Sequence, residues 1–125
     1  MVHAEVDSTK NLLKMTFSQR VTVEETRDWR QKLPALLAQL KPGFKSLNNF
    51  TGMESMDRAC APDIEFVMDR CNEAGVVKVV RVIPDPRQDI GLNIMSVFHY
   101  RRCISIVTCE TLEQGMAALS DGNDE

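Results

Sequence analysis

Features that would point to a membrane or metal protein are missing from this chain of 125 residues. No apolar run approaches the roughly 20 residues that a membrane-spanning helix needs. The start, Met1 to Val6, lacks the charged and apolar regions of a signal peptide. Its two histidines and four cysteines show no zinc-ligand spacing. These absences predict a cytoplasmic chain with no membrane span and no bound metal.

The chain also lacks a strong excess of charge of either sign. The chain has 15 Lys and Arg against 18 Asp and Glu, which gives a net charge of -3. A broad positive field supplies most of the affinity of non-specific nucleic-acid binding, so DNA and RNA are not expected as partners. There is also no phosphate-cradling glycine loop and no nucleophile-elbow pattern. The sequence therefore predicts no cofactor and favours a binding protein over an enzyme.

The four cysteines, Cys60, Cys71, Cys103 and Cys109, are too widely spaced to form a Cys-x-x-Cys pair. In a cytosolic chain such residues behave as small buried hydrophobes, and we expect reduced, passive thiols. His99 with Cys60 or Cys103 would be the pair for a cysteine-dependent enzyme, because a reactive thiolate needs a base or cation beside it. No sequence pattern brings them together, so this hypothesis ranks last.

What is present is the composition of an ordinary globular domain, with 43% hydrophobic and 26% charged residues. The length fits one domain, which we assign to residues 1–119, followed by a polar tail at 120–125. Two apolar runs, 2–6 and 12–17, flank a turn-rich segment and predict a β-hairpin. Thr22 and Glu25 then have capping-box spacing, so a helix should begin there and end at Pro42-Gly43.

The middle of the chain predicts a strand at 44–51, a loop at 52–62 and a second helix. That helix has Pro62 in its first turn, an apolar stripe from Ile64 to Cys71, and Gly75 as a left-handed cap. The run 76–83 is almost continuously apolar and β-branched, which is typical of an inner strand covered on both faces.

The last third predicts a helix after Asp89, a strand at 103–108 and a final helix. Thr111 and Gln114 repeat the capping-box spacing ahead of an apolar stripe of Leu112, Met116 and Leu119. The complete order is a hairpin followed by alternating helices and strands. It predicts an α/β fold with a mostly parallel central sheet flanked by helices and an antiparallel edge.

Residues 49–60 read Asn-Phe-Thr-Gly-Met-Glu-Ser-Met-Asp-Arg-Ala-Cys. This segment and the element order resemble the STAS domain family of anti-sigma factor antagonists. Its members carry Asp-Leu-Ser-Gly, three variable residues, an apolar residue and then Asp-Ser-Ser-Gly. The resemblance implies the SpoIIAA-like fold, a regulatory role and a protein partner.

The resemblance also shows where this chain departs from the family. Asp57 matches the second motif aspartate, but Arg58 stands where regulatory members carry the serine that an anti-sigma kinase phosphorylates. Ala59 and Cys60 follow it, and Asn49 replaces the first aspartate. Because arginine has no hydroxyl group, the family's phosphorylation switch does not carry over to this position.

Two groups of residues are candidate sites. The first is the loop set Ser55, Asp57, Arg58 and Cys60, which would bind a partner or an anion because ligands collect at helix starts after parallel strands. The second is the basic cluster His99, Arg101 and Arg102. For each group a simple solvated surface, or cations facing a helix end, remains the competing interpretation.

The sequence thus leaves three functions open. The first is a non-enzymatic interaction domain that binds a protein partner, with a homodimer as one form of that partner. The second is a domain that binds or senses a small anionic ligand through Arg58. The third is the cysteine-dependent enzyme.

Overall fold

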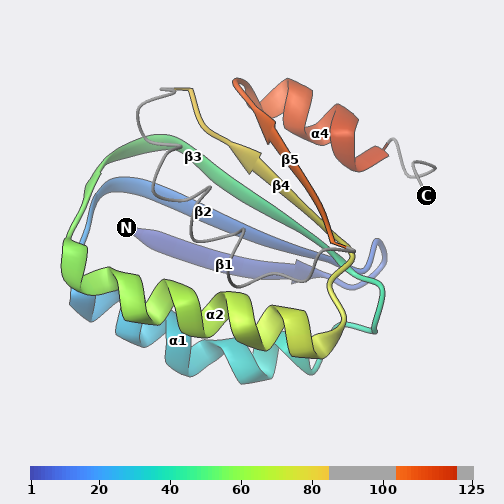
Figure 1. Ribbon diagram of the computed structural model, residues 1–125, viewed down its shortest axis with the longest axis horizontal. Helices are drawn as coiled ribbons and strands as arrows, with labels where there is room; N and C mark the ends of the chain where they lie inside the picture. Colours follow the sequence, from blue (N-terminus) through green and yellow to red (C-terminus); the bar gives the residue numbers. More distant parts are fainter. Residues whose placement is uncertain (85–103, 121–125) are drawn as a thin grey trace.

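The centre of the fold is a five-stranded sheet, seen in a computed structural model that describes residues 1–84 and 104–120 (Figure 1). Its strands lie side by side in chain order: β1 (Val2–Asp7), β2 (Leu12–Val21), β3 (Lys45–Met56), β4 (Lys78–Val82) and β5 (Ser105–Cys109). The β1 and β2 pair is antiparallel, and each later pair is parallel. The predicted antiparallel edge on a mostly parallel sheet is confirmed.

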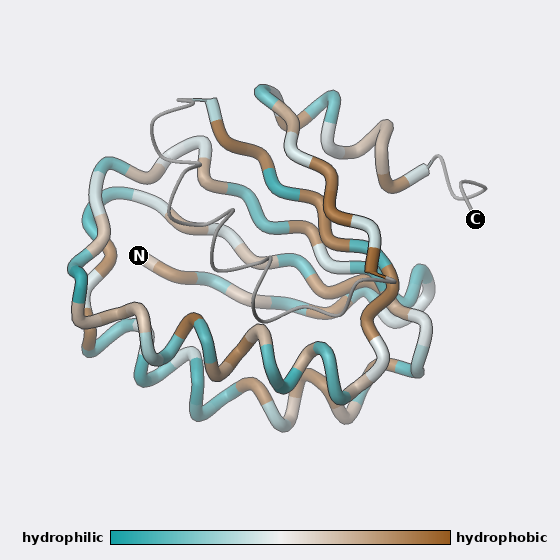
Figure 2. Tube along the Cα trace, in the orientation of Figure 1, coloured by the Kyte–Doolittle hydropathy of each residue, from teal (hydrophilic) through white to brown (hydrophobic). Residues whose placement is uncertain are grey.

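Helices cover both faces of this sheet among the described residues. Figure 1 shows α1 (Val23–Leu37) and α2 (Ala61–Ala74) side by side on one face and α4 (Leu112–Ser120) on the other. Two buried clusters match these layers, a larger one between the sheet and the α1 and α2 pair, and a smaller one beneath α4. Figure 2 shows the brown, hydrophobic positions concentrated along the inner strands. This is a three-layer α/β domain.

The period-2 pattern of β2 buries alternate residues, as the sequence predicts. Leu13, Met15 and Phe17 are all at most 3% exposed. The Phe17 ring stacks on Phe50 of β3 with 4.6 Å between ring centroids, and it meets Trp29 of α1 edge to face at 5.4 Å. These aromatic contacts hold α1, the helix that connects β2 to β3, against the sheet.

The predicted capping box begins α1. The Thr22 hydroxyl accepts from the Glu25 amide, and the Glu25 carboxylate accepts from the Thr22 amide at 3.0 Å. The helix ends at Leu37, earlier than the predicted end at Pro42-Gly43. The Leu37 carbonyl accepts from the Leu40 amide at 3.0 Å, so the backbone tightens into a three-residue turn and the helix ends.

The prediction of a loop at 52–62 is wrong for most of that span. β3 continues to Met56, because β2 reaches Val21 and offers backbone partners along its whole length. The pairing has two register shifts in which β3 carries an extra residue, so it continues as a bulged strand. Gly52 lies at the first shift, where a Cβ atom would come within 3.3 Å of the Ser18 side chain.

The elements that follow agree with the sequence prediction. Pro62 lies in the first turn of α2, and Gly75 ends that helix with a φ of 100°, in the left-handed region. β4 is an inner strand between β3 and β5, and its five residues are all buried. The strand is shorter than the predicted run of 76–83.

The last helix confirms its predicted cap but not its predicted buried face. The Gln114 amide donates to the Thr111 hydroxyl at 3.1 Å, and the Gln114 side chain accepts from the Thr111 amide at 3.3 Å. Leu112 and Met116 are 42% and 38% exposed, whereas Leu119 is buried with Gly115 on the face toward the sheet. The helix α4 therefore packs on the sheet through the close approach of Gly115, and not through a continuous apolar stripe.

The helix predicted after Asp89 lies outside the described residues, as do residues 121–125 of the predicted tail, whereas Ser120 is the last residue of α4. Across residues 1–84 and 104–120, none of the helices has the length and apolar character required to cross a membrane.

Candidate functional site

The junction between β3 and α2 carries the candidate residues of the first group. β3 ends at Met56, Asp57 follows it, and a short 3-10 helix, η1 (Arg58–Cys60), leads directly into α2. The junction lies at the carboxyl ends of the parallel strands, at the left of Figure 1. That end of an open α/β sheet is where ligands and partners usually bind.

Asp57 is fixed in place by the neighbouring strand. Its backbone amide donates to the Val21 carbonyl at 3.0 Å. Its carboxylate accepts from Arg20 Nε at 3.2 Å and from Arg20 Nη2 at 2.9 Å. The side chains of Arg20 and Asp57 are 68% and 32% exposed, so the pair lies at the surface. It ties the last residues of β2 to the start of the α2 region.

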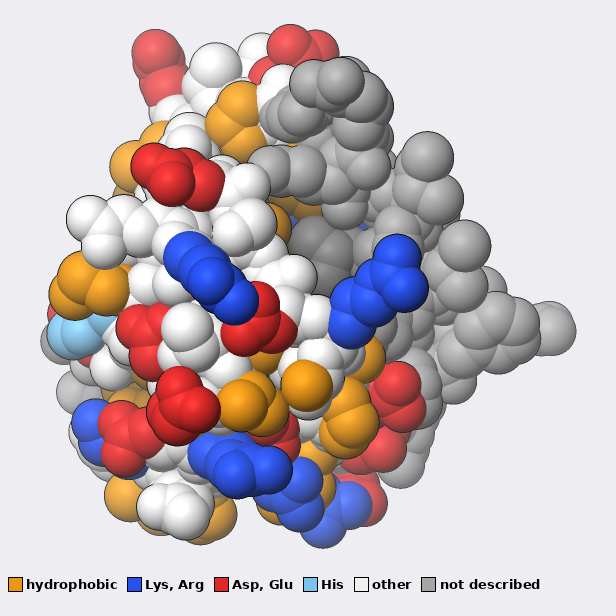
Figure 3. Space-filling view, turned by 90° about the vertical axis from the view of Figure 1, so that its left-hand side faces the viewer, with side chains coloured by type: hydrophobic (Ala, Val, Ile, Leu, Met, Phe, Trp, Pro, Cys, Tyr) orange, Lys and Arg blue, Asp and Glu red, His pale blue; other side chains and the backbone are white. Residues whose placement is uncertain are grey.

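Arg58 and Ser55 are exposed beside this anchored aspartate. Within the described part of the chain, neither side chain has a hydrogen bond or an ion pair. We call the exposed Ser55 and Arg58, together with the partly exposed Asp57, the α2-start surface. Figure 3 looks at this end of the molecule, where blue, red and orange side chains are mixed and no single charge dominates.

Cys60, the fourth member of the predicted group, lies in the core and not on that surface. It is fully buried, and its thiol donates to the Val21 carbonyl at 3.7 Å. Burial is the main cause that raises the pKa of this thiol, and the nearby carboxylates of Asp57 and Asp63 add to the effect. Cys60 therefore anchors the junction from beneath as a protonated thiol.

Sequence reasoning missed a buried polar contact between α1 and α2. Asp63 is 5% exposed, and its carboxylate accepts from the Thr26 hydroxyl at 2.8 Å and from Arg30 Nη1 at 3.2 Å. The Arg30 guanidinium also lies 4.0 Å from the centroid of the Phe66 ring. These bonds offset the cost of burying a carboxylate and hold the first turn of α2 against α1.

A signal for this contact exists in the sequence, although it is faint. Asp63 follows Pro62 in the first turn of a predicted helix, where an acid also suits the helix dipole. Thr26 and Arg30 are four residues apart and so share one face of α1. The helix pattern could have placed each residue at the edge of a buried stripe, but it could not have paired them.

The second candidate group, His99, Arg101 and Arg102, lies outside the described residues. Among residues 1–84 and 104–120, no three His, Cys, Asp or Glu side chains gather closely enough to hold a metal ion.

Comparison with solved structures identifies the fold. The unphosphorylated anti-sigma factor antagonist SpoIIAA matches with a TM-score of 0.69 at 12% identity, covering 98% of this chain and 99% of its own. An uncharacterised protein with a SpoIIAA-like fold from Shewanella loihica matches with a TM-score of 0.71 at 14% identity, over 95% and 92%. An anti-sigma factor antagonist from Mycobacterium paratuberculosis gives 0.62 at 14% identity, over 97% and 96%.

No protein-family model matches the chain, and no curated protein matches its sequence. The similarity to solved structures spans nearly the whole chain, but the identities are low. It shows that this chain has the SpoIIAA-like α/β fold, as the STAS resemblance implies.

Proposed function

We propose that this domain is a non-enzymatic regulatory module that binds a protein partner through the α2-start surface and the first turns of α2. Two proteins of the same fold are described as anti-sigma factor antagonists, a name that implies action on another protein. The fold alone does not fix a function, so the proposal depends on the surface itself.

The observation that carries the proposal is the exposed Arg58 beside an aspartate that is already paired. Because Arg20 neutralises Asp57 at 2.9 Å, the Arg58 charge is not consumed by its chain neighbour. Arginine binds carboxylate and phosphate groups with a planar, two-pronged geometry. We therefore expect the partner to present an acidic group to this surface.

The same residue argues against a serine switch at this position. One structural neighbour is described in an unphosphorylated form, a description that implies control by phosphate. Position 58 here carries a permanent positive charge and no hydroxyl group. Phosphorylation of residue 58 would therefore not regulate binding at this surface.

The cysteine-dependent enzyme gains no support from the site. A nucleophilic cysteine needs a lowered thiol pKa and access to substrate, whereas Cys60 is buried with a raised pKa. The alternative function, binding of a small anion by Arg58 and the backbone amides at the start of α2, is also weakened, because two of these amides already donate hydrogen bonds within the chain. The Asp57 amide is bonded to Val21 and the Cys60 amide to the Asp57 carbonyl.

The proposal places the domain in the cytoplasm. Cys60, Cys71 and Cys109 are free thiols, as expected in a reducing compartment. A second copy of the chain is the alternative partner, and size-exclusion chromatography of the purified protein at several concentrations distinguishes a homodimer from a monomer.

Partner capture followed by a matched pair of variants tests the proposal. The tagged chain is used to recover binding proteins from a cell lysate, and the recovered partner is titrated against wild type, Arg58→Ala and Lys41→Ala at low and moderate salt. Lys41 is an exposed cation next to Asn11, at the other end of β2. We expect Arg58→Ala to weaken binding about fivefold or more, with a smaller salt dependence, because an interfacial charge is lost.

Lys41→Ala should leave the dissociation constant unchanged. If Arg58→Ala also leaves it unchanged at both salt concentrations, the α2-start surface is not the interface and the proposal fails. An equal loss in both variants would point to general electrostatic attraction and would fail it as well.

A further inference from the structure

A cavity opens at the opposite end of the sheet from the α2-start surface. It has a volume of about 360 Å³ and is lined by the turn after β1, the first residues of β2 and β3, and the last turn of α4. Leu12, which lines the cavity, and Val21, whose carbonyl accepts from the Asp57 amide, are the two ends of β2. At about 3.3 Å per residue, the two sites lie roughly 30 Å apart.

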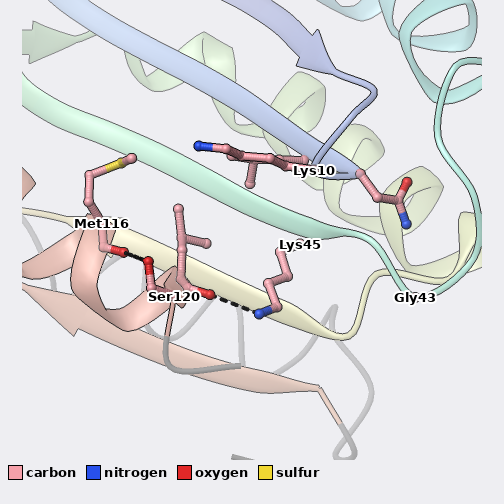
Figure 4. Close-up of a pocket in the computed structure, with 8 residues that line it drawn as sticks. Lys10, Gly43, Lys45, Met116 and Ser120 are labelled. Carbon is pink, nitrogen blue, oxygen red and sulfur yellow. Dashed lines mark hydrogen bonds between the residues drawn. The ribbon is translucent and has the colours of Figure 1, made fainter. Parts of the chain in front are cut away.

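Two ammonium groups border the cavity. Figure 4 shows the Lys10 side chain extending toward Met116, while Lys45 Nζ turns to α4 and donates to the Leu119 carbonyl at 2.8 Å. A lysine has three donor hydrogens, so Lys45 keeps two for a ligand. Within the described residues, the Lys10 ammonium has no ion pair, and no acidic side chain lines the cavity.

The floor of the cavity is apolar. Leu12 and Leu119 are 4% and 9% exposed and pack together in the cluster beneath α4. Met116 adds a flexible, half-exposed side chain from the outer turn of α4. A cationic rim above an aliphatic floor matches a molecule that has an anionic head and a short hydrocarbon chain.

The backbone beneath the rim is fixed by hydrogen bonds around Asn11 before any ligand arrives. Asn11 adopts a positive φ of 52°, and its side chain grips the Lys41 backbone twice, accepting from the amide at 2.9 Å and donating to the carbonyl at 3.2 Å. The Asn11 carbonyl also accepts from the Lys45 amide at 3.2 Å. A preorganised rim spares a ligand part of the ordering cost of binding.

The α4 helix end would oppose an anion if its carbonyls were free, because the helix dipole is negative there. Lys45 and its register neighbour Lys78 both donate to that end, and Lys78 Nζ reaches the Ala118 carbonyl at 2.6 Å. The helix has no basic residue of its own in the last turn. The two strand lysines therefore offset the negative end and leave the cavity electrostatically suited to an anion.

We infer that this cavity, here called the Lys10–Lys45 pocket, is a binding site for a small aliphatic carboxylate. A volume of 360 Å³ corresponds to roughly twelve waters at about 30 Å³ each, which suits a ligand of about ten non-hydrogen atoms. Lysines bind carboxylate and phosphate groups alike as point charges, so the apolar floor decides the ligand class, because it favours a hydrocarbon chain over a hydrated phosphate. The site is independent of the proposed partner surface.

Titration of the full-length, 15N-labelled protein with four probes tests the ligand class. The probes are hexanoate, acetate, hexylammonium and inorganic phosphate. Hexanoate should bind saturably with a dissociation constant of about 1 mM or below, and its amide shifts should be confined to residues 10–12, 43–45 and 116–120. Acetate should bind at least about tenfold more weakly because it has none of the methylenes that hexanoate buries, and hexylammonium should not bind.

Two lysine variants test the rim. Lys10→Gln removes an exposed ammonium and should weaken hexanoate binding by about threefold to tenfold. Lys41→Gln changes a neighbouring lysine that does not line the pocket, and it should leave binding unchanged. Both side chains are exposed, so neither variant should disturb folding.

Several outcomes would overturn the inference. These are the absence of saturable shifts with hexanoate up to about 20 mM, shifts spread over the whole molecule, or binding of hexylammonium or phosphate as strong as that of hexanoate. An equal effect of Lys10→Gln and Lys41→Gln would likewise reject the pocket, because it would assign the attraction to general charge.

Discussion

At the scale of single residues, burial decides what the cysteines can do. Cys71 is fully buried on α2, and burial raises the pKa of its thiol from 9.0 to about 12. In the unfolded chain the same thiol titrates near its ordinary value. The folded state therefore holds a proton that the unfolded state releases between pH 9 and 12, and stability that is fully present below pH 9 is lost as the pH rises through that window.

We predict that Cys71→Ala flattens the alkaline loss of stability. Three pH units correspond to about 4 kcal/mol, so the wild type should lose up to that amount between pH 9 and 12 through this thiol. The variant should lose less, although a small cavity costs it about 1–2 kcal/mol at pH 7. Urea unfolding with reductant at pH 7.5, 9 and 10.5 measures both effects. Cys109→Ala is the control, and equal pH slopes in wild type and Cys71→Ala would contradict the prediction.

Single residues also show where sequence reasoning stops. Arg58 could be singled out because it interrupts a recognisable motif, and the structure places it at the surface. The ion pair of Arg20 with Asp57 joins positions 37 residues apart, and a chain pattern carries no record of such pairing. Lys78 sits in a run that reads as apolar, and its role became visible only when α4 supplied a carbonyl for it.

At the scale of the element, local signals were the most dependable. Both capping boxes, at Thr22 and Thr111, and the Gly75 cap form as predicted, because each depends on residues a few positions apart. Boundaries set by a distant partner were missed. β3 extends to Met56 because β2 lies beside it, and Leu112 faces away from the sheet because Gly115 makes the contact.

The α4 contact leads to a prediction about Gly115→Ala. A Cβ atom at this position would lie 2.6 Å from Val82 Cγ2, and the branched Val82 side chain is fully buried. Alanine favours the helix by about 1 kcal/mol over glycine, whereas overpacking costs about 1–3 kcal/mol. We expect a net loss of about 1 kcal/mol in the free energy of unfolding, measured by urea denaturation.

A rescue variant identifies the cause. In a Val82→Ala background the clash is removed, and Gly115→Ala should become neutral or stabilising. The same loss in both backgrounds would show that the close approach of α4 to β4 is not what the glycine provides.

At the scale of the whole molecule, the order of elements was enough to predict a mostly parallel sheet flanked by helices. Alternating helices and strands imply parallel pairing, and the continuous apolar run before Pro84 implies an inner strand. Both conclusions agree with the structure. The assignment of helices to the two faces was not predicted, because each helix pattern gives its own buried side but not the side of the sheet on which it packs.

We predict that β4 contains the most protected amides of the molecule. Its five residues are buried, β3 and β5 flank it, and helices lie on both faces. In native-state hydrogen exchange, the amides of Val79 to Val82 should open only with global unfolding, while those of the edge strand β1 exchange faster. Rapid exchange throughout β4 would contradict its place at the centre of the fold.

The chain-ordered sheet also has a consequence for how the protein is made. Because β1 to β5 lie side by side in the order of synthesis, each new strand finds its partner already outside the ribosome. The hairpin and the first two crossovers can assemble while the remainder is still being translated, and no strand must wait for a later one to fill a gap. The α4 helix, which is synthesised after the five described strands, then packs on β3, β4 and β5.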